Sequence, residues 1–448
     1  MSDTASNIAA NLDMLQANAI KITGITLTDG GVPTLAVTAA QLLTDAGALS
    51  KISGNYSLSV SGVNAGNLTS VLVNPHVLPV IVSDSAANIA AMLDVLQANA
   101  ANISGIGLTD GGTPTLVVSA AQWVDDGGAL NLLTGQCNLS VSGVNTGNLI
   151  AVLAAISSWS GLGAQLLPVQ VSDSAANIAT YLDALQDNIA NIAGIGLTDG
   201  GTPTLAIYAS QLTDDANALA LISGDYNLSV SNVRLANLPA VLGNSHVTSV
   251  AVMDSSINIL AALDTTLAVN IANISDIALL HFGGSGFVST LALTSAQLLN
   301  DTAVLAKITS PYQVSLASVN ANALPVALAN SHVLTPLQLA DTAANVASVL
   351  DLAQAAGSQL AGIHLTNSGT PILAITAAQY LADKPALGKI LQADAYRLSL
   401  GNEVFTNFAK DLANNRVIGV SFLDSAINFV AALKKQSVIK QCRQNCRY

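Results

Sequence analysis

The feature that most constrains this chain is an internal repeat. A six-residue segment that begins with aspartate and has asparagine at its fifth position, such as Asp84–Ile89, recurs along the sequence. Its copies begin near residues 3, 84, 173, 254, 341 and 424, at intervals of 81 to 89 residues. Self-similarity at such a period is typical of arrays in which one supersecondary unit stacks on the next. The repeat therefore predicts a single array over residues 1–433, with five repeats of about 80 residues and a partial sixth.

Each repeat carries both strand and helix patterns. Leu58 and Val60 alternate with serine, which is the period of a strand with one buried face. Ile89, Leu93 and Leu96 have the spacing of three and four that places one apolar stripe on a helix. We expect about four strands in each repeat, three of them followed by a helix. The sequence thus predicts an α/β repeat solenoid of short, mostly parallel strands alternating with alanine-rich helices, in a layout like that of leucine-rich repeats.

The predicted helix starts share one polar signature. Serine or threonine followed three residues later by glutamine is a capping box, in which each side chain bonds a free backbone N–H group of the other residue. The recurring aspartate is interpreted in the same way, as a turn and cap residue beside the positive end of a helix dipole. The predicted structural caps are Thr38, Gln41, Asp84, Ser85, Asn88, Ser119, Gln122, Asp173 and Asn177.

An Asp-Gly-Gly loop follows the first strand pattern of the early repeats, at Asp29, Asp110 and Asp199. About ten residues separate the two strand patterns around it, too few for a helix, so the loop is either a hairpin turn or part of a short coil without a helix. The short coil is favoured, because the serine and threonine face has no pattern for covering helices. Calcium needs six to eight oxygens, and each loop offers one carboxylate, so these three aspartates are only weak calcium candidates.

Composition excludes several classes of protein. No apolar run approaches the ~20 residues of a transmembrane helix, so no transmembrane segment is expected. Residues 1–433 carry all 27 acidic residues of the chain, an acidity that argues against binding nucleic acid. The first residues lack the pattern of a cleavable signal peptide. Residues 434–448 form a basic tail or cap that contains the thiols of Cys442 and Cys446.

No catalytic, cofactor-binding or metal site is predicted, because recurring serine and aspartate match catalytic patterns by chance. The adjacent carboxylates Asp125-Asp126 and Asp214-Asp215 are interpreted as solvated helix faces, and Cys137 as a buried apolar substitute. The irregular loop Phe282–Phe287, which follows His281, is where a catalytic cleft would most easily arise.

The repeats resemble those of very large secreted bacterial proteins, the RTX or adhesin-like "calcium-binding" proteins exported by type I secretion. The similar segments are Ser83–Ile89, Leu108–Leu116 and Asn330–Val333. The resemblance implies an extracellular or cell-surface, repetitive and non-enzymatic role, with no catalytic residues to carry over.

The hypothesis that follows is a structural or adhesive repeat protein that presents a Ser/Thr-rich sheet face. Its partner would be a second copy of itself, in self-assembly, or an extracellular surface or glycan. The alternatives are a toxin or effector that engages a receptor, and a recognition surface for an ordered glycan or ice lattice. An enzyme would need a convergent cleft, which a repeated sheet face does not provide.

Overall fold

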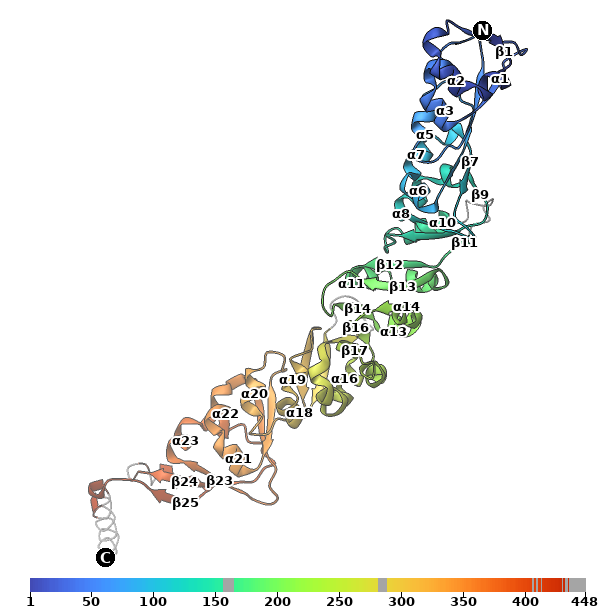
Figure 1. Cartoon of the computed structure of the whole chain (residues 1–448). Helices are drawn as coiled ribbons and strands as arrows, with labels where there is room; N and C mark the ends of the chain where they lie inside the picture. The colour runs from blue at the N-terminus through green and yellow to red at the C-terminus, as the bar shows by residue number, and fades with distance from the viewer. Residues whose placement is uncertain are drawn as a thin grey trace, which may run out of the picture. The chain divides into compact units, whose positions relative to one another are not determined.

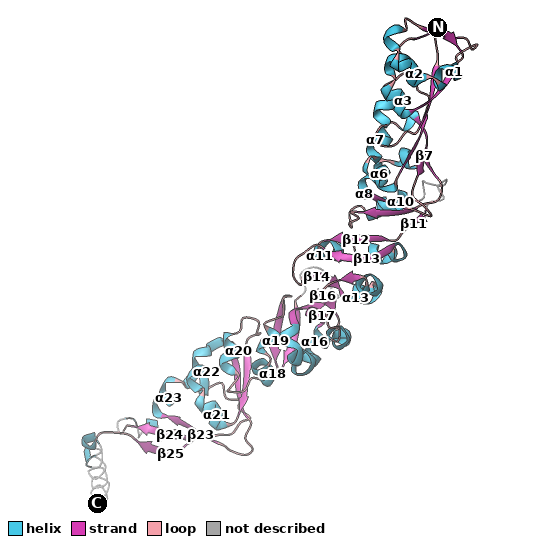
Figure 2. Ribbon diagram, viewed as in Figure 1, coloured by secondary structure: helices cyan, strands magenta, loops and turns pink. Residues whose placement is uncertain are grey.

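The computed structural model describes residues 1–155, 165–280 and 288–404, followed by residues 407, 410–411, 413–428, 430–431 and 434. The chain forms two compact units, Met1–Leu228 and Ser229–Tyr448. Short strands alternate with short helices in both units (Figure 2). The protein is thus a mixed α/β protein with many short parallel strands.

Unit 1 is built from strands of two to six residues. They are β1 (Ser2–Asp3), β2 (Ile25–Leu27), β3 (Thr34–Thr38), β4 (Ile52–Ser53), β5 (Ser57–Ser61), β6 (Val80–Asp84), β7 (Ile103–Leu108), β8 (Thr115–Ser119), β9 (Leu133–Thr134), β10 (Asn138–Ser142), β11 (Gln165–Leu166), β12 (Val169–Asp173), β13 (Ile192–Leu197), β14 (Thr204–Tyr208) and β15 (Ile222–Ser223).

The helices of unit 1 mostly come in pairs joined by a single residue. They are α1 (Ala5–Ala10), α2 (Leu12–Ala17), α3 (Ala39–Thr44), α4 (Ala46–Leu49), α5 (Leu68–Leu72), α6 (Ala86–Ala91), α7 (Leu93–Ala98), α8 (Ala120–Asp125), α9 (Gly127–Leu130), α10 (Leu149–Ala155), α11 (Ala175–Thr180), α12 (Leu182–Asp187), α13 (Ala209–Asp214) and α14 (Ala216–Ala220), with 3-10 turns η1 (Ala19–Lys21), η2 (Ala100–Asn102) and η4 (Ile189–Asn191).

The strand pairs of unit 1 are parallel, among them β1–β2, β2–β4, β3–β5, β6–β7 and β7–β9. Parallel neighbours require a long connection, here called a crossover, and each crossover carries the short helices. Alternation along β3 buries Leu35 and Val37 and exposes the residues between them. Figure 1 shows α3, α5 and α7 along one side of this region and β7 and β9 along the other.

The helices bury one narrow stripe each. In the pair α6 and α7, Ile89, Leu93 and Leu96 are fully buried, as their spacing predicts. Both helices are short because each pair is interrupted by one non-helical residue, here Met92 with φ −111° and ψ 15°. The core is therefore a continuous aliphatic layer between helices and strands, with few aromatic side chains.

The Asp-Gly-Gly connection is not a hairpin, and no helix lies between β2 and β3, as the favoured alternative without a helix predicted. Strands β2 and β3, on either side of Asp29, do not pair with each other but belong to different sheets, β1–β2–β4 and β3–β5. The loop is a corner that connects β2, in one group of parallel strands, to β3, in another group. Gly31 has φ +75° there, a left-handed conformation that glycine adopts without steric cost.

Unit 2 repeats the same plan. Its strands are β17 (Val247–Ser255), β18 (Ile274–Leu280), β19 (Ser289–Leu293), β20 (Tyr312–Leu316), β21 (Leu337–Asp341), β22 (Leu360–Leu365), β23 (Ile372–Thr376), β24 (Arg397–Glu403) and β25 (Val417–Phe422), and β16 (Asn227–Val233) contains the boundary with unit 1. The pairs β17–β18, β19–β20, β21–β22, β23–β24 and β24–β25 are parallel.

The helices of unit 2 follow the same order. They are α15 (Leu238–Leu242), α16 (Ser256–Ala262), α17 (Ala268–Asn270), α18 (Ser295–Asn300), α19 (Thr302–Leu305), α20 (Leu324–Ala329), α21 (Ala343–Ser348), α22 (Leu350–Ala356), α23 (Ala377–Ala382) and α24 (Lys384–Leu387), with the π-helical turn η6 (Leu263–Leu267) and the 3-10 turns η5 (Leu235–Asn237), η7 (Ile271–Asn273) and η8 (Gly357–Gln359).

Candidate functional site

The outward faces of the strand ladders carry rows of hydroxyl groups. In the β3–β5 pair, Thr34 lies beside Ser57 and Thr38 lies beside Ser61. Between these rows Ala36 and its neighbour on β5 are both exposed. The face therefore offers small polar side chains in register, interrupted by an apolar one.

The equivalent β8–β10 pair presents a similar face. Thr115 pairs with Asn138, and Ser119 pairs with Ser142, while Val117 takes the central apolar place and is 53% exposed. The Ser142 hydroxyl donates to a carbonyl oxygen of β8 at 3.1 Å, so part of the hydroxyl row also stabilises the ladder. This recurring face, called here the hydroxyl face, consists of the outward residues of β3, β5, β8 and β10.

Each of the three weak calcium candidates accepts a hydrogen bond from the N-terminus of a helix. Oδ2 of Asp29 accepts the backbone N–H of Ala5 at 2.6 Å, and Asp110 makes the same contact with Ala86 at 2.6 Å. Asp199 repeats it with the first residue of α11. Each loop thus caps the N-terminus of a helix whose first residue lies 24 residues before the aspartate.

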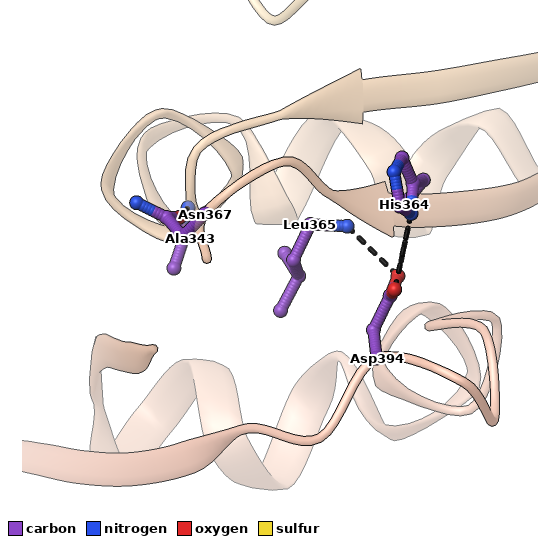
Figure 3. Close-up of polar contacts among 5 residues, drawn as sticks. All are labelled: Ala343, His364, Leu365, Asn367 and Asp394. Carbon is purple, nitrogen blue, oxygen red and sulfur yellow. Dashed lines mark hydrogen bonds and ion pairs between the residues drawn. The ribbon is translucent and has the colours of Figure 1, made fainter. Parts of the chain in front are cut away.

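A later copy of the loop shows that this contact needs an acceptor and not a charge. Asn367 stands in the aspartate position, and its Oδ1 accepts the backbone N–H of Ala343 at 2.6 Å (Figure 3). In the same view Asp394 accepts from the backbone N–H of Leu365 at 2.9 Å and lies 3.0 Å from Nδ1 of His364. A neutral amide that makes the same bond favours a capping role over cation binding.

The aspartate that ends the strand before each helix pair, called here the strand-end aspartate, joins two parts of the chain. In Asp173, Oδ1 accepts from the N–H of Ser174 and from the amide of Asn177. Its Oδ2 accepts from both the backbone N–H and the hydroxyl of Thr146, 27 residues earlier. Burial opposes ionisation of this group, but the four bonds outweigh it and hold the pKa of Asp173 at about 2.

Asp84 has the same arrangement, with the backbone N–H of Ala65 in place of the threonine. Here too burial raises the pKa of the carboxyl less than the hydrogen bonds lower it, so the net pKa lies below the usual range. Ser85 accepts from the backbone N–H of Asn88, as a cap does, but the Asn88 amide bonds Asp84 and not the backbone of Ser85. The Asp84 carboxylate thus accepts the backbone N–H of the cap residue Ser85, as the side chain of Gln41 accepts the backbone N–H of Thr38 in a capping box.

The predicted capping boxes take the expected geometry. The Thr38 hydroxyl accepts from the backbone N–H of Gln41, whose side chain accepts from the backbone N–H of Thr38. Ser119 and Gln122 form the same reciprocal pair. The glutamine amide also reaches the previous crossover, since Nε2 of Gln41 donates to Asp13 at 3.0 Å.

The interpretation of the adjacent aspartates as solvated is right for Asp125 and Asp214 and wrong for Asp126 and Asp215. Asp125 is exposed, but Asp126 is only 5% exposed and lies at the junction between α8 and α9. Asp215 has the same place between α13 and α14. The stacking of one crossover on the next covers this position. We call these residues junction aspartates, and the five of them are Asp45, Asp126, Asp215, Asp301 and Asp383.

Each junction aspartate faces a second carboxylate from the preceding crossover. Burial, together with a side-chain hydrogen bond and charge repulsion from the facing Asp94, raises the pKa of Asp126 to about 6. The pKa of Asp215 is raised to about 6 for the same reasons, with Asp183 opposite. This pairing of a buried acid with an exposed one is the feature of the molecule that sequence reasoning missed. The recurrence of a second aspartate about thirty residues earlier was its only sequence signal.

One further acid pair stands in the core of unit 2. Glu403 is 0% exposed and Asp411 is 2% exposed, at positions that Val63 and Val71 occupy in the first repeat. Burial raises the pKa of Glu403, against a hydrogen bond from the backbone of Val404, and Asp411 raises it further. The only glutamate of the chain is thus buried beside another acid.

Two histidines at the same repeat position pack against tyrosines. The His76 ring stacks on Tyr56 at 4.0 Å, and its Nδ1 lies 2.9 Å from the Tyr56 carbonyl oxygen. His332 and Tyr312 repeat both contacts. An open groove of about 460 Å3 lies beside Tyr56 and His76, and one of about 300 Å3 lies beside the second pair.

The remaining candidates divide between described and undescribed residues. Cys137 is buried, 3% exposed, as expected for an apolar substitute, and burial raises the pKa of its thiol. Cys442, Cys446, His281 and the loop Phe282–Phe287 lie outside the described residues.

Within the described parts of the chain, no three His, Cys, Asp or Glu side chains are grouped so that they could hold a metal ion. Over the same residues, no helix combines the length and apolar character needed to cross a bilayer. No model of a known protein family matches this chain, and no curated protein matches it.

Proposed function

We propose that this chain is a non-enzymatic, extracellular structural or adhesive protein, built as an α/β repeat solenoid that presents the hydroxyl face to its partner. The observation that carries the proposal is the recurrence of the exposed face. The rows of Thr34 with Ser57 and of Thr115 with Asn138 stand at equivalent places in successive repeats.

The parallel pairing supports the solenoid. In the pairs β1–β2, β3–β5, β6–β7 and β21–β22 the two strands are parallel and helices lie between them in the chain, and the same crossover contacts recur in both units. Such nearest-neighbour stacking lets the core grow by addition of repeats. A surface repeated in this way suits contact with an extended partner, because many weak identical contacts add through avidity.

The apolar residues within the face favour adhesion or self-association over recognition of a regular lattice. Val117 of the hydroxyl face is 53% exposed, and on other strands Ile81 of β6 is 60% exposed and Tyr208 of β14 is 56% exposed. A lattice would require identical side chains in every row, whereas a protein or glycan surface tolerates variation. Exposed apolar side chains also contribute contact area to protein association.

The test compares two double variants of the full chain. Thr34→Lys with Ser59→Lys places charges on the hydroxyl face, whereas Thr69→Lys with Met14→Lys places them on exposed helix positions of α5 and α2. We expect the unmodified chain to form ordered assemblies in electron micrographs or to adhere to glycan-coated surfaces, and only the first variant to lose this. Equal behaviour of the two variants would remove the hydroxyl face from the proposal.

A further inference from the structure

Five pairs of carboxyl groups recur in register through the repeats. In each pair a junction aspartate, between 3% and 5% exposed, faces an aspartate on the helix of the preceding crossover. The pairs are Asp45 with Asp13, Asp126 with Asp94, Asp215 with Asp183, Asp301 with Asp264 and Asp383 with Asp351.

One oxygen of each junction aspartate lacks a conventional hydrogen-bond donor. Within the described residues, Oδ2 of all five is buried without a hydrogen-bond partner. A buried polar atom of this kind is costly unless it is satisfied. The group that faces it is a carboxylate, which accepts hydrogen bonds and donates none. A proton on the junction aspartate would supply the missing donor.

The other groups around the pairs do not supply a positive charge. Asp125 lies next to Asp126, while Asp214 and Asp187 lie near Asp215, and all three add repulsion. The Thr44 hydroxyl bonds Asp45 at Oδ1. Lys384 follows Asp383 in the sequence, but its Nζ lies over the ring of Tyr380 at 5.8 Å.

Glutamine side chains donate hydrogen bonds to four of the facing aspartates, Asp13, Asp94, Asp183 and Asp264. Gln211 donates to Asp183 at 2.7 Å, and Gln297 donates to Asp264 at 3.1 Å. The hydrogen bond from Gln211 lowers the pKa of Asp183, and the facing Asp215 lowers it further. The two members of a pair are thus unequal, because one is solvated and bonded by an amide while the other is buried.

We propose that each of the five pairs holds one shared proton, carried by the junction aspartate and donated to the facing carboxylate, and that these protons tie successive crossovers together. The array is therefore strengthened by mild acid. A calcium ion is a poorer occupant, because it needs six to eight oxygens and a pair offers at most four.

The sign of the pH dependence follows from linkage. The junction aspartates bind protons more tightly when folded than when unfolded, with a pKa of about 6 for four of them against an ordinary 3.8. Their stabilisation is complete below about pH 4 and is lost as the pH rises through about 6. Five equivalent sites make the effect larger than any one pair could.

The experiment follows thermal unfolding of the full chain between pH 4.5 and about 8 in 1 M salt, which screens repulsion between exposed charges. We expect the melting temperature to fall by about 5 °C or more as the pH rises. A variant with asparagine at all five junction positions keeps a donor for the facing carboxylate at every pH. It should melt higher than the unmodified chain at pH 8 and show a flatter pH profile.

Two further measurements keep the test decisive if that variant folds poorly. Infrared spectra of the unmodified chain should show protonated carboxyl groups at pH 5.5 that disappear by pH 8. The control Asp225→Asn, at an exposed aspartate outside the pairs, should retain the original profile. A melting temperature that does not fall between pH 5 and 8 would overturn the proposal. So would calcium stabilisation at pH 8 that the five-site variant abolishes, since the pairs would then be metal sites.

Discussion

The strand-end aspartates and the junction aspartates belong to the same repeats, yet the structure shifts their pKa values in opposite directions. Asp173 meets four hydrogen-bond donors and has a pKa of about 2, while Asp126 meets a second carboxylate and has a pKa of about 6. Both are partly or wholly buried, and burial by itself raises the pKa of each. The comparison shows that what decides the charge of a covered carboxyl group is the supply of donors around it.

The largest expected effect comes from removing a strand-end carboxylate. Asp173→Ala leaves the N–H groups of Ser174 and Thr146, and the amide of Asn177, without their acceptor. We expect a loss of about 2–4 kcal/mol in the free energy of unfolding, measured by urea denaturation at pH 7, because several donors lose one partner. Asp225→Ala should change it by less than about 0.5 kcal/mol. A loss at Asp173 no larger than that of the control would show that the donors find water instead.

Substitution by asparagine should change the free energy of unfolding in opposite directions at Asp126 and Asp173. At pH 8, Asp126→Asn removes a buried charge and gives a donor to Asp94, so we expect unfolding to cost about 1–2 kcal/mol more. Asp173→Asn weakens bonds to a charged acceptor and should lower the free energy of unfolding by a similar amount. Urea titrations of both variants at one pH would check this. Destabilisation by both would mean that packing around Asp126, and not its charge, dominates.

The acid side of the pH profile tests the strand-end group alone. Because folding lowers the pKa of Asp173 and Asp84, their stabilisation is present above about pH 4 and is lost as the pH falls towards 2. We expect a decrease of about 1 kcal/mol per group over this range, since both carboxyls retain some contact with solvent. Circular dichroism melts from pH 2 to 4 would measure it, and Asp173→Asn should flatten the curve.

The smallest expected effect concerns a cap that relies on neither aspartate. Thr38→Ala removes the acceptor for the backbone N–H of Gln41 and should cost about 1 kcal/mol, equally at pH 5 and pH 8. Thr38→Ser retains the hydroxyl and serves as the matched control. A cost that changed with pH would indicate that the cap is coupled to the Asp45 pair through the contact of Gln41 with Asp13.

Much of the local structure could be predicted because it depends on near neighbours in sequence. The stripe of Ile89, Leu93 and Leu96 is buried, and Thr38 bonds Gln41 three residues away. The corner at Asp29 could not be derived, because strands β2 and β3 pair with partners more than twenty residues distant and not with each other. The exposure of Asp126 was misjudged for the same reason. Its surroundings are set by α7, which lies in the preceding crossover.

The sequence by itself determined the repeat, the alternation of strands and short helices, and the capping boxes, since each follows from periodicity or from bonds within one turn. Only the tertiary structure decided which groups meet between crossovers. It placed Asp110 on the N-terminus of α6 and set Asp126 against Asp94. These contacts span 24 and about thirty residues, and the hydrophobic pattern alone does not fix the register of one crossover on the next. Because of that register, the pKa of the strand-end aspartate is lowered and the pKa of the junction aspartate is raised within the same kind of repeat.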